Sequence, residues 1–234
     1  MAAKKKLVQS EAKNAARGDG SALAASADLC DAYWNHVLEH GQVPASVFKF
    51  CKSLGMDEAD FYRRYGSFES LEADFWTSTD QSAVAALDSD PETADYDARQ
   101  LLLAFYFTYM ESIVAHRSKF LLRFPSIRSP GGRALEGFRR EFDAFSSRVI
   151  QKAREDGLIA ELKQLNSLQE KGLYPQFRFL IDFHLKDSSR GFEDSDALIE
   201  KTVRFFFDAA KFPVLESSLD LLRFLAPRLR SHWT

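Results

Sequence analysis

The sequence has few cysteines, with Cys30 and Cys51 the only two in 234 residues. Two cysteines cannot build a disulfide framework, and the distance between them does not match the close spacing of a zinc motif. Each lies on the apolar side of a segment with helical periodicity, where a reduced thiol packs as a small hydrophobic group. We therefore predict that both thiols are structural rather than redox-active.

Long apolar runs are also missing. No segment approaches the ~20 apolar residues that a membrane-spanning helix needs. The basic cluster Lys4, Lys5 and Lys6 is not followed by the apolar stretch of a signal peptide. The net charge is −3, so neither sign is in large excess. These absences predict a cytoplasmic protein with no membrane span.

Motifs for catalysis and cofactor binding are absent from the sequence. It contains no G-x-S-x-G elbow, no phosphate-binding glycine-rich loop, no C-x-x-C pair and no dinucleotide fingerprint. The segment His36–His40 matches the H-x-x-E-H pattern of one class of zinc peptidases. A catalytic zinc needs a third protein ligand, however, and no recognisable one follows. We predict that the protein is not an enzyme and has neither a metal site nor a cofactor.

Helical periodicity runs through the chain, and no segment alternates like a half-buried strand. We predict an all-α protein in three parts: a basic tail over residues 1–27, a small helical module over residues 28–87, and a larger helical domain over residues 92–234. The tail has a net charge of +3, which serves either solubility or contact with a DNA minor groove. The boundary between module and domain is expected near Thr77–Pro91.

The stretch Pro44–Trp76 predicts two short helices joined by a tight turn, followed directly by a third helix. Gly55 follows the first helix, where a left-handed C-cap is needed. Asp57 is placed to cap the second helix, Gly66 to end it, and Ser67 to cap the third. A helix, a glycine-containing turn and a second helix form the unit that places a recognition helix in a DNA groove.

Residues 28–76 resemble the N-terminal module of TetR-like regulators. The hydrophobic–small pair is Phe50-Cys51, the glycine after three further residues is Gly55, the aromatic residue seven further on is Tyr62, and the opening of the next helix is Ser67-Phe68-Glu69-Ser70-Leu71. The resemblance implies a DNA-binding transcription regulator with double-stranded DNA as its partner. The residues it implies for phosphate and base contacts are Lys49, Lys52, Tyr62, Arg63 and Arg64.

Two features of the module depart from the family pattern. Phe68 stands where the family commonly has a phosphate-binding lysine, and Asp57-Glu58-Ala59-Asp60 puts three carboxylates in the first turn of the recognition helix. Over residues 28–76, nine acidic residues face four basic ones, which is a net charge of −5. Because phosphate contacts dominate DNA affinity, a second hypothesis stays open. TetR-like folds also occur in a lipid- or isoprenoid-binding accessory protein, whose module would dock a protein partner.

The larger domain is expected to consist of helices separated by proline and glycine signals. The predicted helices span about residues 96–120, 133–155, 158–172, 175–186, 196–211 and 213–230. The segments Phe124-Pro125-Ser126 and Ser129-Pro130 are expected to interrupt the chain, and Pro175 to begin a helix at its first position. Asp156-Gly157 is expected to end the helix that precedes it.

The sequence contains 21 phenylalanines, and many of them fall on the apolar sides of these predicted helices. Aromatic stripes at helical spacing form a packed core, a ligand cavity, or a core left incomplete around a ligand. The resemblance implies a hydrophobic small-molecule or lipid effector in this domain. The candidate ligand residues are Phe105, Tyr106, Tyr109, His116, Phe177, Phe183 and His184.

The last two predicted helices resemble the pair through which TetR-like proteins dimerise. Their apolar side chains exceed what one small domain easily hides, so we expect a homodimer that spaces two modules about one DNA turn apart. The alternative is that these helices complete the core of a monomer. The candidate interface residues are Leu198, Phe205, Phe206, Leu219, Leu222 and Leu225.

Overall fold

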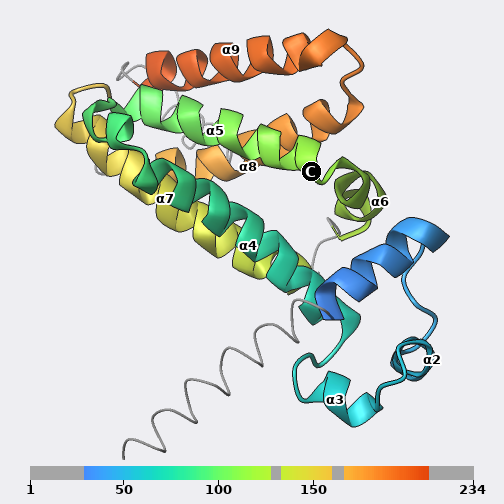
Figure 1. Ribbon diagram of the computed structural model, residues 1–234. Coiled ribbons are helices and arrows are strands. Elements are labelled where there is room, and N and C mark those ends of the chain that lie inside the picture. The colour runs from blue at the N-terminus through green and yellow to red at the C-terminus, as the bar shows by residue number, and fades with distance from the viewer. Residues whose placement is uncertain (1–28, 128–132, 160–165, 211–234) are drawn as a thin grey trace, which may run out of the picture.

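The computed structural model describes residues 29–127, 133–159 and 166–210, and these residues form an all-helical protein, as predicted (Figure 1). The helices are residues 29–40, α2 (Val47–Ser53), α3 (Glu58–Tyr62), α4 (Phe68–Ser89), α5 (Ala98–Ala115), α6 (Arg117–Ile127), α7 (Glu136–Glu155), α8 (Asn166–Lys186) and α9 (Glu193–Ala210). Short 3-10 turns lie at Pro91–Asp95, Arg133–Leu135 and Arg190–Phe192. The predicted tail over residues 1–27 and the predicted helix over residues 213–230, with Leu219, Leu222 and Leu225, lie outside the described ranges.

The small module is held together by an aromatic core. Phe68 stacks on Tyr33 with ring centroids 5.3 Å apart, and it meets Phe50 and Phe61 at 5.5 and 5.4 Å in edge-to-face geometry. Such pairs add about 0.5–1.5 kcal/mol each beyond the area that they bury. The phenylalanine at the family's lysine position therefore belongs to the module's core.

Local signals place the helices of the module largely as predicted. Gly55 has φ +66°, the left-handed conformation that a residue without a Cβ adopts without strain. Ser67 accepts from the backbone N–H of Ser70, whose side chain accepts in return from the backbone of Ser67, which is a reciprocal capping box. The expectation for Asp57 is half right, because it occupies the N-cap position of α3 but its side chain makes no capping hydrogen bond.

α4 links the module to the larger domain without a break (Figure 1). Its first half buries Leu71 and Trp76 beside the module, and its second half buries Ala83 and Leu87. The second half packs against α5 and α7. The stretch at which the sequence suggested a boundary, from Thr77 onward, is thus helical up to Ser89.

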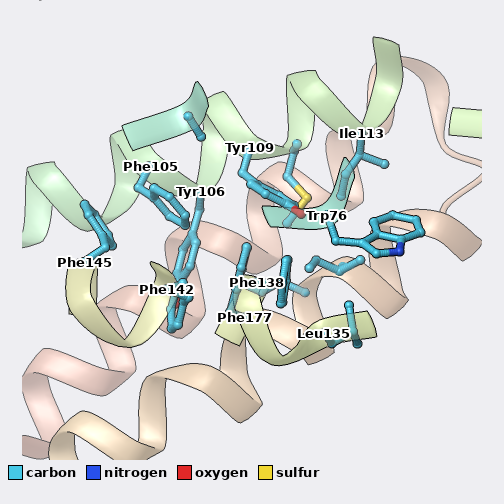
Figure 2. Close-up of a cluster of buried hydrophobic side chains, with 14 of the residues drawn as sticks. Trp76, Phe105, Tyr106, Tyr109, Ile113, Leu135, Phe138, Phe142, Phe145 and Phe177 are labelled. Carbon is cyan, nitrogen blue, oxygen red and sulfur yellow. The ribbon is translucent and has the colours of Figure 1, made fainter. Parts of the chain in front are cut away.

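Aromatic rings from three helices fill the larger domain (Figure 2). Phe177 of α8 stacks on Phe142 of α7 with centroids 4.4 Å apart, and Phe105 of α5 stacks on Phe145 of α7 at 4.2 Å. Each such buried side chain contributes about 1.5–3 kcal/mol relative to an exposed one. α9 packs against α5 and α8.

Several helix boundaries differ from the prediction, and one of them is the end of α3, which lies at Tyr62 rather than at Gly66. The helix expected over residues 96–120 ends at Ala115, and His116 (φ −121°, ψ 23°) separates α5 from α6. Pro125 lies inside α6 instead of interrupting the chain, and Pro175 lies inside α8 instead of beginning it. A proline removes one backbone donor and strains one turn. α6 ends two residues after Pro125, and Pro175 is exposed, so neither proline disturbs a buried contact.

Candidate functional site

The five predicted DNA-contacting residues all lie on the surface of the module. Lys49 and Lys52 are exposed on α2, Tyr62 is exposed at the end of α3, and Arg63 and Arg64 follow it. The helix-turn-helix unit thus presents all five side chains to solvent, as a DNA contact requires. Whether they bind DNA stays a prediction.

Acidic and apolar side chains surround these basic groups. Arg63 forms an ion pair with Asp60 one turn earlier. A depression of about 390 Å³ lies between α2 and α3, and Phe48, Lys52, Met56 and Glu58 are among its lining residues. Phe48 is 58% exposed, an unusual position for a phenylalanine. This surface is mixed in charge and partly hydrophobic.

The histidines of the H-x-x-E-H segment do not assemble a metal site with other ligands. His36 and His40 stack on each other with ring centroids 4.2 Å apart, and Nδ1 of His40 lies 2.9 Å from the backbone oxygen of His36. Within the described ranges, no group of three or more potential ligands from His, Cys, Asp and Glu comes together.

Four of the seven predicted effector residues come together in the interior. Phe105, Tyr106, Tyr109 and Phe177 are fully buried, and the ring of Phe177 lies 5.4, 5.6 and 4.7 Å from the other three. Figure 2 shows them together with Phe138 and Phe142. The Tyr106 hydroxyl donates to Oε1 of Gln176 at 3.3 Å. This cluster is where helices of a bundle commonly hold a ligand.

The other three predicted effector residues lie elsewhere. His116 is exposed at the end of α5, and its ring contacts Phe75 of the module at 5.5 Å. Phe183 is partly buried with its ring 6.5 Å from the exposed Phe179. His184 is buried at the end of α8 against Phe192 at 4.6 Å. The spacing of these residues placed them on the correct helices but not at the same site.

His184 lies at a junction that closes the end of α8. Arg117, the first residue of α6, donates to the backbone oxygens of His184, Leu185 and Asp187 at 3.2, 3.1 and 3.4 Å. Burial, followed by the charge of Arg117, lowers the pKa of His184, so its imidazole is neutral at pH 7. We assign this histidine to the helix junction rather than to the aromatic interior.

Sequence reasoning missed one interior residue, Asp80 of α4. It is fully buried, and neither carboxylate oxygen has a hydrogen-bond partner among the described residues. Burial, and then the charge of Glu141, raises the pKa of Asp80 well above its usual range. The signal was present in the sequence, because Asp80 lies on the same helical face as Trp76, Ala83 and Leu87, at i+4, i+7 and i+11 from the tryptophan.

A second missed group, Glu72, joins the module to α6. It is 1% exposed and accepts a hydrogen bond from the Tyr33 hydroxyl. Arg123 of α6 donates to both of its oxygens, from Nε at 2.7 Å and from Nη2 at 3.2 Å. Burial, followed by the charge of Glu72, raises the pKa of Tyr33, which keeps the phenol protonated as a donor. One buried carboxylate thus connects three helices.

α6 packs on the module along its length. Lys119 lies over the rings of Phe75 and Trp34 at 4.8 and 5.4 Å. Phe120 and Phe124 meet the ring of Trp76 at 4.9 and 5.8 Å. Any displacement of α6 would therefore change its contacts with the module.

The predicted dimer residues that the structure describes lie on α9. Phe205 is 74% exposed, and Leu198 and Phe206 are partly buried. On α8, Phe179 is 52% exposed. A contiguous exposed apolar patch is typical of a surface that meets a partner, and the rings of Phe179 and Phe205 are candidates for such a patch. The interface itself stays a prediction.

Comparison with protein families decides the classification. The family model described as the tetracyclin repressor-like C-terminal domain matches residues 101–225, more than half of the chain. The chain belongs to the TetR family. Its larger domain is therefore a TetR C-terminal domain, as the resemblance implied. No curated protein matches the sequence.

Solved structures support the same fold for this TetR-family chain. A putative TetR family transcription regulator from Shewanella sp. PV-4 is 14% identical, with a TM-score of 0.57 over 79% of this chain and 96% of that one. The fatty acid degradation regulator FadR from Bacillus halodurans is 14% identical, with a TM-score of 0.56 over 76% and 96%. A protein of unknown function from Rhodococcus sp. RHA1 is 18% identical, with a TM-score of 0.55 over 79% and 94%.

Family membership also bears on the question of catalysis. TetR-family regulators are generally not enzymes, which supports the prediction that this chain is not one. Among the described residues, no helix combines the length and the apolar composition that crossing a membrane requires.

Proposed function

We propose that this TetR-family chain is a homodimeric, DNA-binding transcription regulator that responds to a hydrophobic small molecule. The observation that carries the proposal is the buried connection from Tyr33 and Glu72 to Arg123. A regulator needs a physical link between the domain that senses a ligand and the module that meets DNA. Here that link is a desolvated carboxylate shared by both parts.

The module would contact DNA through its exposed basic residues. Lys49, Lys52, Arg63 and Arg64 would neutralise phosphates, and Tyr62 would reach the backbone or a base edge. The acidic turn around Asp57 limits the electrostatic part of the affinity. Two modules held by a dimer offset this limit, because each half-site then adds its own contacts to one complex.

The larger domain would bind the effector in its aromatic interior, around Phe105, Tyr109 and Phe177. The similarity to FadR from Bacillus halodurans, a fatty acid degradation regulator, supports a hydrophobic effector. A ligand among these rings would shift the packing of α5, and α6 follows α5 directly at His116. The α6 contacts with Trp76 and Glu72 would carry that shift to the module.

The dimer would form through α8, α9 and the chain that follows them. Exposed Phe179 and Phe205 supply apolar area for such a surface. Leu198 and Phe206 flank it, and the predicted contributions of Leu219, Leu222 and Leu225 belong to the same proposal. A two-fold interface would fix the spacing of the two modules.

The test is binding of the purified protein to DNA from upstream of its own gene, titrated across salt concentration. We expect binding that weakens steeply with salt, because counterions are released from the phosphates. The Arg63→Ala, Arg64→Ala double variant should lose most of this binding. The matched control, Arg140→Ala with Arg190→Ala, removes the same charge from exposed positions outside the module and should bind like wild type.

A second function is supported by the surface of the module. Exposed Phe48, Leu54 and Tyr62 lie beside an acidic turn, and Arg63 is already paired with Asp60. Such a surface suits a protein partner, with the larger domain holding a lipid or isoprenoid. In the same experiment, DNA binding no stronger than that of an unrelated acidic protein, together with lipid in an extract of the purified protein, would favour this accessory role.

A further inference from the structure

The carboxyl group of Asp80 is buried without a partner in the part of the chain that the structure describes. It projects from the inner face of α4 with no exposed surface, and both of its carboxylate oxygens lack a hydrogen-bond partner among the described residues. Leaving a buried carboxyl group unpaired costs stability in either protonation state. A residue that only filled the core would not need a carboxylate, so this group points to a partner other than the described residues.

The surroundings of Asp80 come from three other helices. Tyr109 of α5 and Tyr174 of α8 both interact electrostatically with it, and so does Glu141 of α7, which also pairs with Arg140 at 3.3 Å. The Tyr109 hydroxyl is also buried without a hydrogen-bond partner in the described part of the chain. Two unsatisfied polar groups thus lie together where four helices meet, which is how bundle sites fix the orientation of a ligand.

Aromatic rings line the same region. Phe138 and Phe177 lie 6.1 and 4.7 Å from the ring of Tyr109, and Phe138 lies 6.2 Å from Tyr174 (Figure 2 shows Tyr109, Phe138 and Phe177). The face of an aromatic ring attracts cations. Carboxylates and ring faces therefore favour the same sign of charge in a ligand.

The nearby arginines are engaged on the outer side of Tyr174. Arg139 and Arg178 lie over that ring at 5.1 and 5.9 Å. Arg139 also pairs with Asp143 of its own helix at 3.4 Å. Neither arginine reaches the oxygens of Asp80, so they do not neutralise it.

We propose that the effector is an organic cation, an amine or quaternary ammonium with apolar substituents, whose charge pairs with Asp80 inside the aromatic cluster. This inference rests on the proposed function, because it names the chemical class of the effector of that regulator. A cation would favour the ionised carboxylate of Asp80, which burial otherwise opposes, whereas an anionic ligand would be repelled by that carboxylate and a neutral lipid would leave it without a counterion. The rings that are now in contact must part to admit the cation, so binding changes helix packing.

The test uses three probes of matched shape in isothermal titration calorimetry: (3-phenylpropyl)trimethylammonium, its uncharged carbon isostere (4,4-dimethylpentyl)benzene, and 4-phenylbutyrate. We expect the full-length protein to bind the cation at least about tenfold more tightly than either of the others. Asp80→Asn, which keeps the shape and removes the charge, should abolish this preference. Asp88→Asn, the same change at an exposed position of α4, should retain it.

Each outcome decides the inference. The inference is overturned if wild type does not bind the cation, or binds the neutral or the anionic probe as tightly or more tightly. This comparison needs only the wild-type protein, so it stands even if Asp80→Asn does not fold. The proposed function is judged separately, by adding each probe to the protein–DNA complex. If only the neutral probe releases DNA, the regulator function is supported and the proposal of a cationic effector is refuted. If calorimetry shows the preference for the cation but the protein does not bind DNA, the cation-binding site is supported and the proposed regulator function is refuted.

Discussion

Replacing Arg123 by alanine should destabilise the protein strongly, because Glu72 would stay buried without its cationic partner. The carboxylate is 1% exposed and now receives two hydrogen bonds from this arginine. Breaking a buried ion pair by removing one partner costs about 3–5 kcal/mol. The Arg123 side chain is 20% exposed, so water partly screens the pair, and we expect a loss of about 2–4 kcal/mol.

The measurement is urea unfolding followed by tryptophan fluorescence, since Trp76 lies next to α6 and reports on this junction. A second variant, Arg123→Met with Glu72→Leu, replaces both charges by apolar groups of similar size. It should recover most of the lost free energy, because no buried charge remains unpaired. Tyr33 then loses its acceptor, so we expect the recovery to fall short of wild type by about 1–3 kcal/mol.

Two results would refute this reasoning. A loss below about 1 kcal/mol for Arg123→Ala would mean that the pair behaves like a surface salt bridge. A double variant no more stable than the single one would mean that Arg123 acts through packing rather than through the charge of Glu72. Far-ultraviolet circular dichroism of each variant at 20 °C serves as the control that each one has the native helical content before unfolding.

Three further predictions follow. Burial raises the pKa of Asp80, so its ionisation opposes folding as the pH rises above the unfolded pKa of about 4. Wild type should therefore lose more free energy of unfolding between pH 5 and 8 than Asp80→Asn does. Urea-unfolding free energies that change in parallel with pH for the two proteins would contradict this. Phe177→Ala should cost about 3–5 kcal/mol in the same assay, and a change below about 1 kcal/mol would show that the aromatic cluster is loosely packed. Phe205→Glu should yield a monomer by light scattering, and an unchanged dimer would exclude this residue from the interface.

The helix-turn-helix unit was predictable because its determinants are local. Gly55 ends one helix through its own backbone conformation, and Ser67 begins another through a partner three residues away. The all-helical class followed in the same way from periodicity. Lys49 and Lys52 were implied by the family resemblance, and both are exposed on α2, whose buried residues are Phe50 and Cys51.

The aromatic interior was predictable only in part. Phe105, Tyr109 and Phe177 meet as expected, since apolar stripes on neighbouring helices pack together. His116 and His184 do not join them, because helical spacing gives the face of a side chain but not its height relative to another helix. Asp80 carried a signal, an acid on a buried face, but a sequence alone does not show whether a counterion reaches it.

The sequence by itself determined the helical class, the caps and the spacing of the module, because those depend on contacts within a few residues. Only the tertiary structure decided the break at His116, the prolines inside α6 and α8, and the joining of Tyr33, Glu72 and Arg123. The partners of Glu72 lie 39 and 51 residues away along the chain. Their meeting depends on how whole helices pack. Desolvation then makes an unpaired charge costly, because a buried carboxylate must find its partner within the fold or in a ligand.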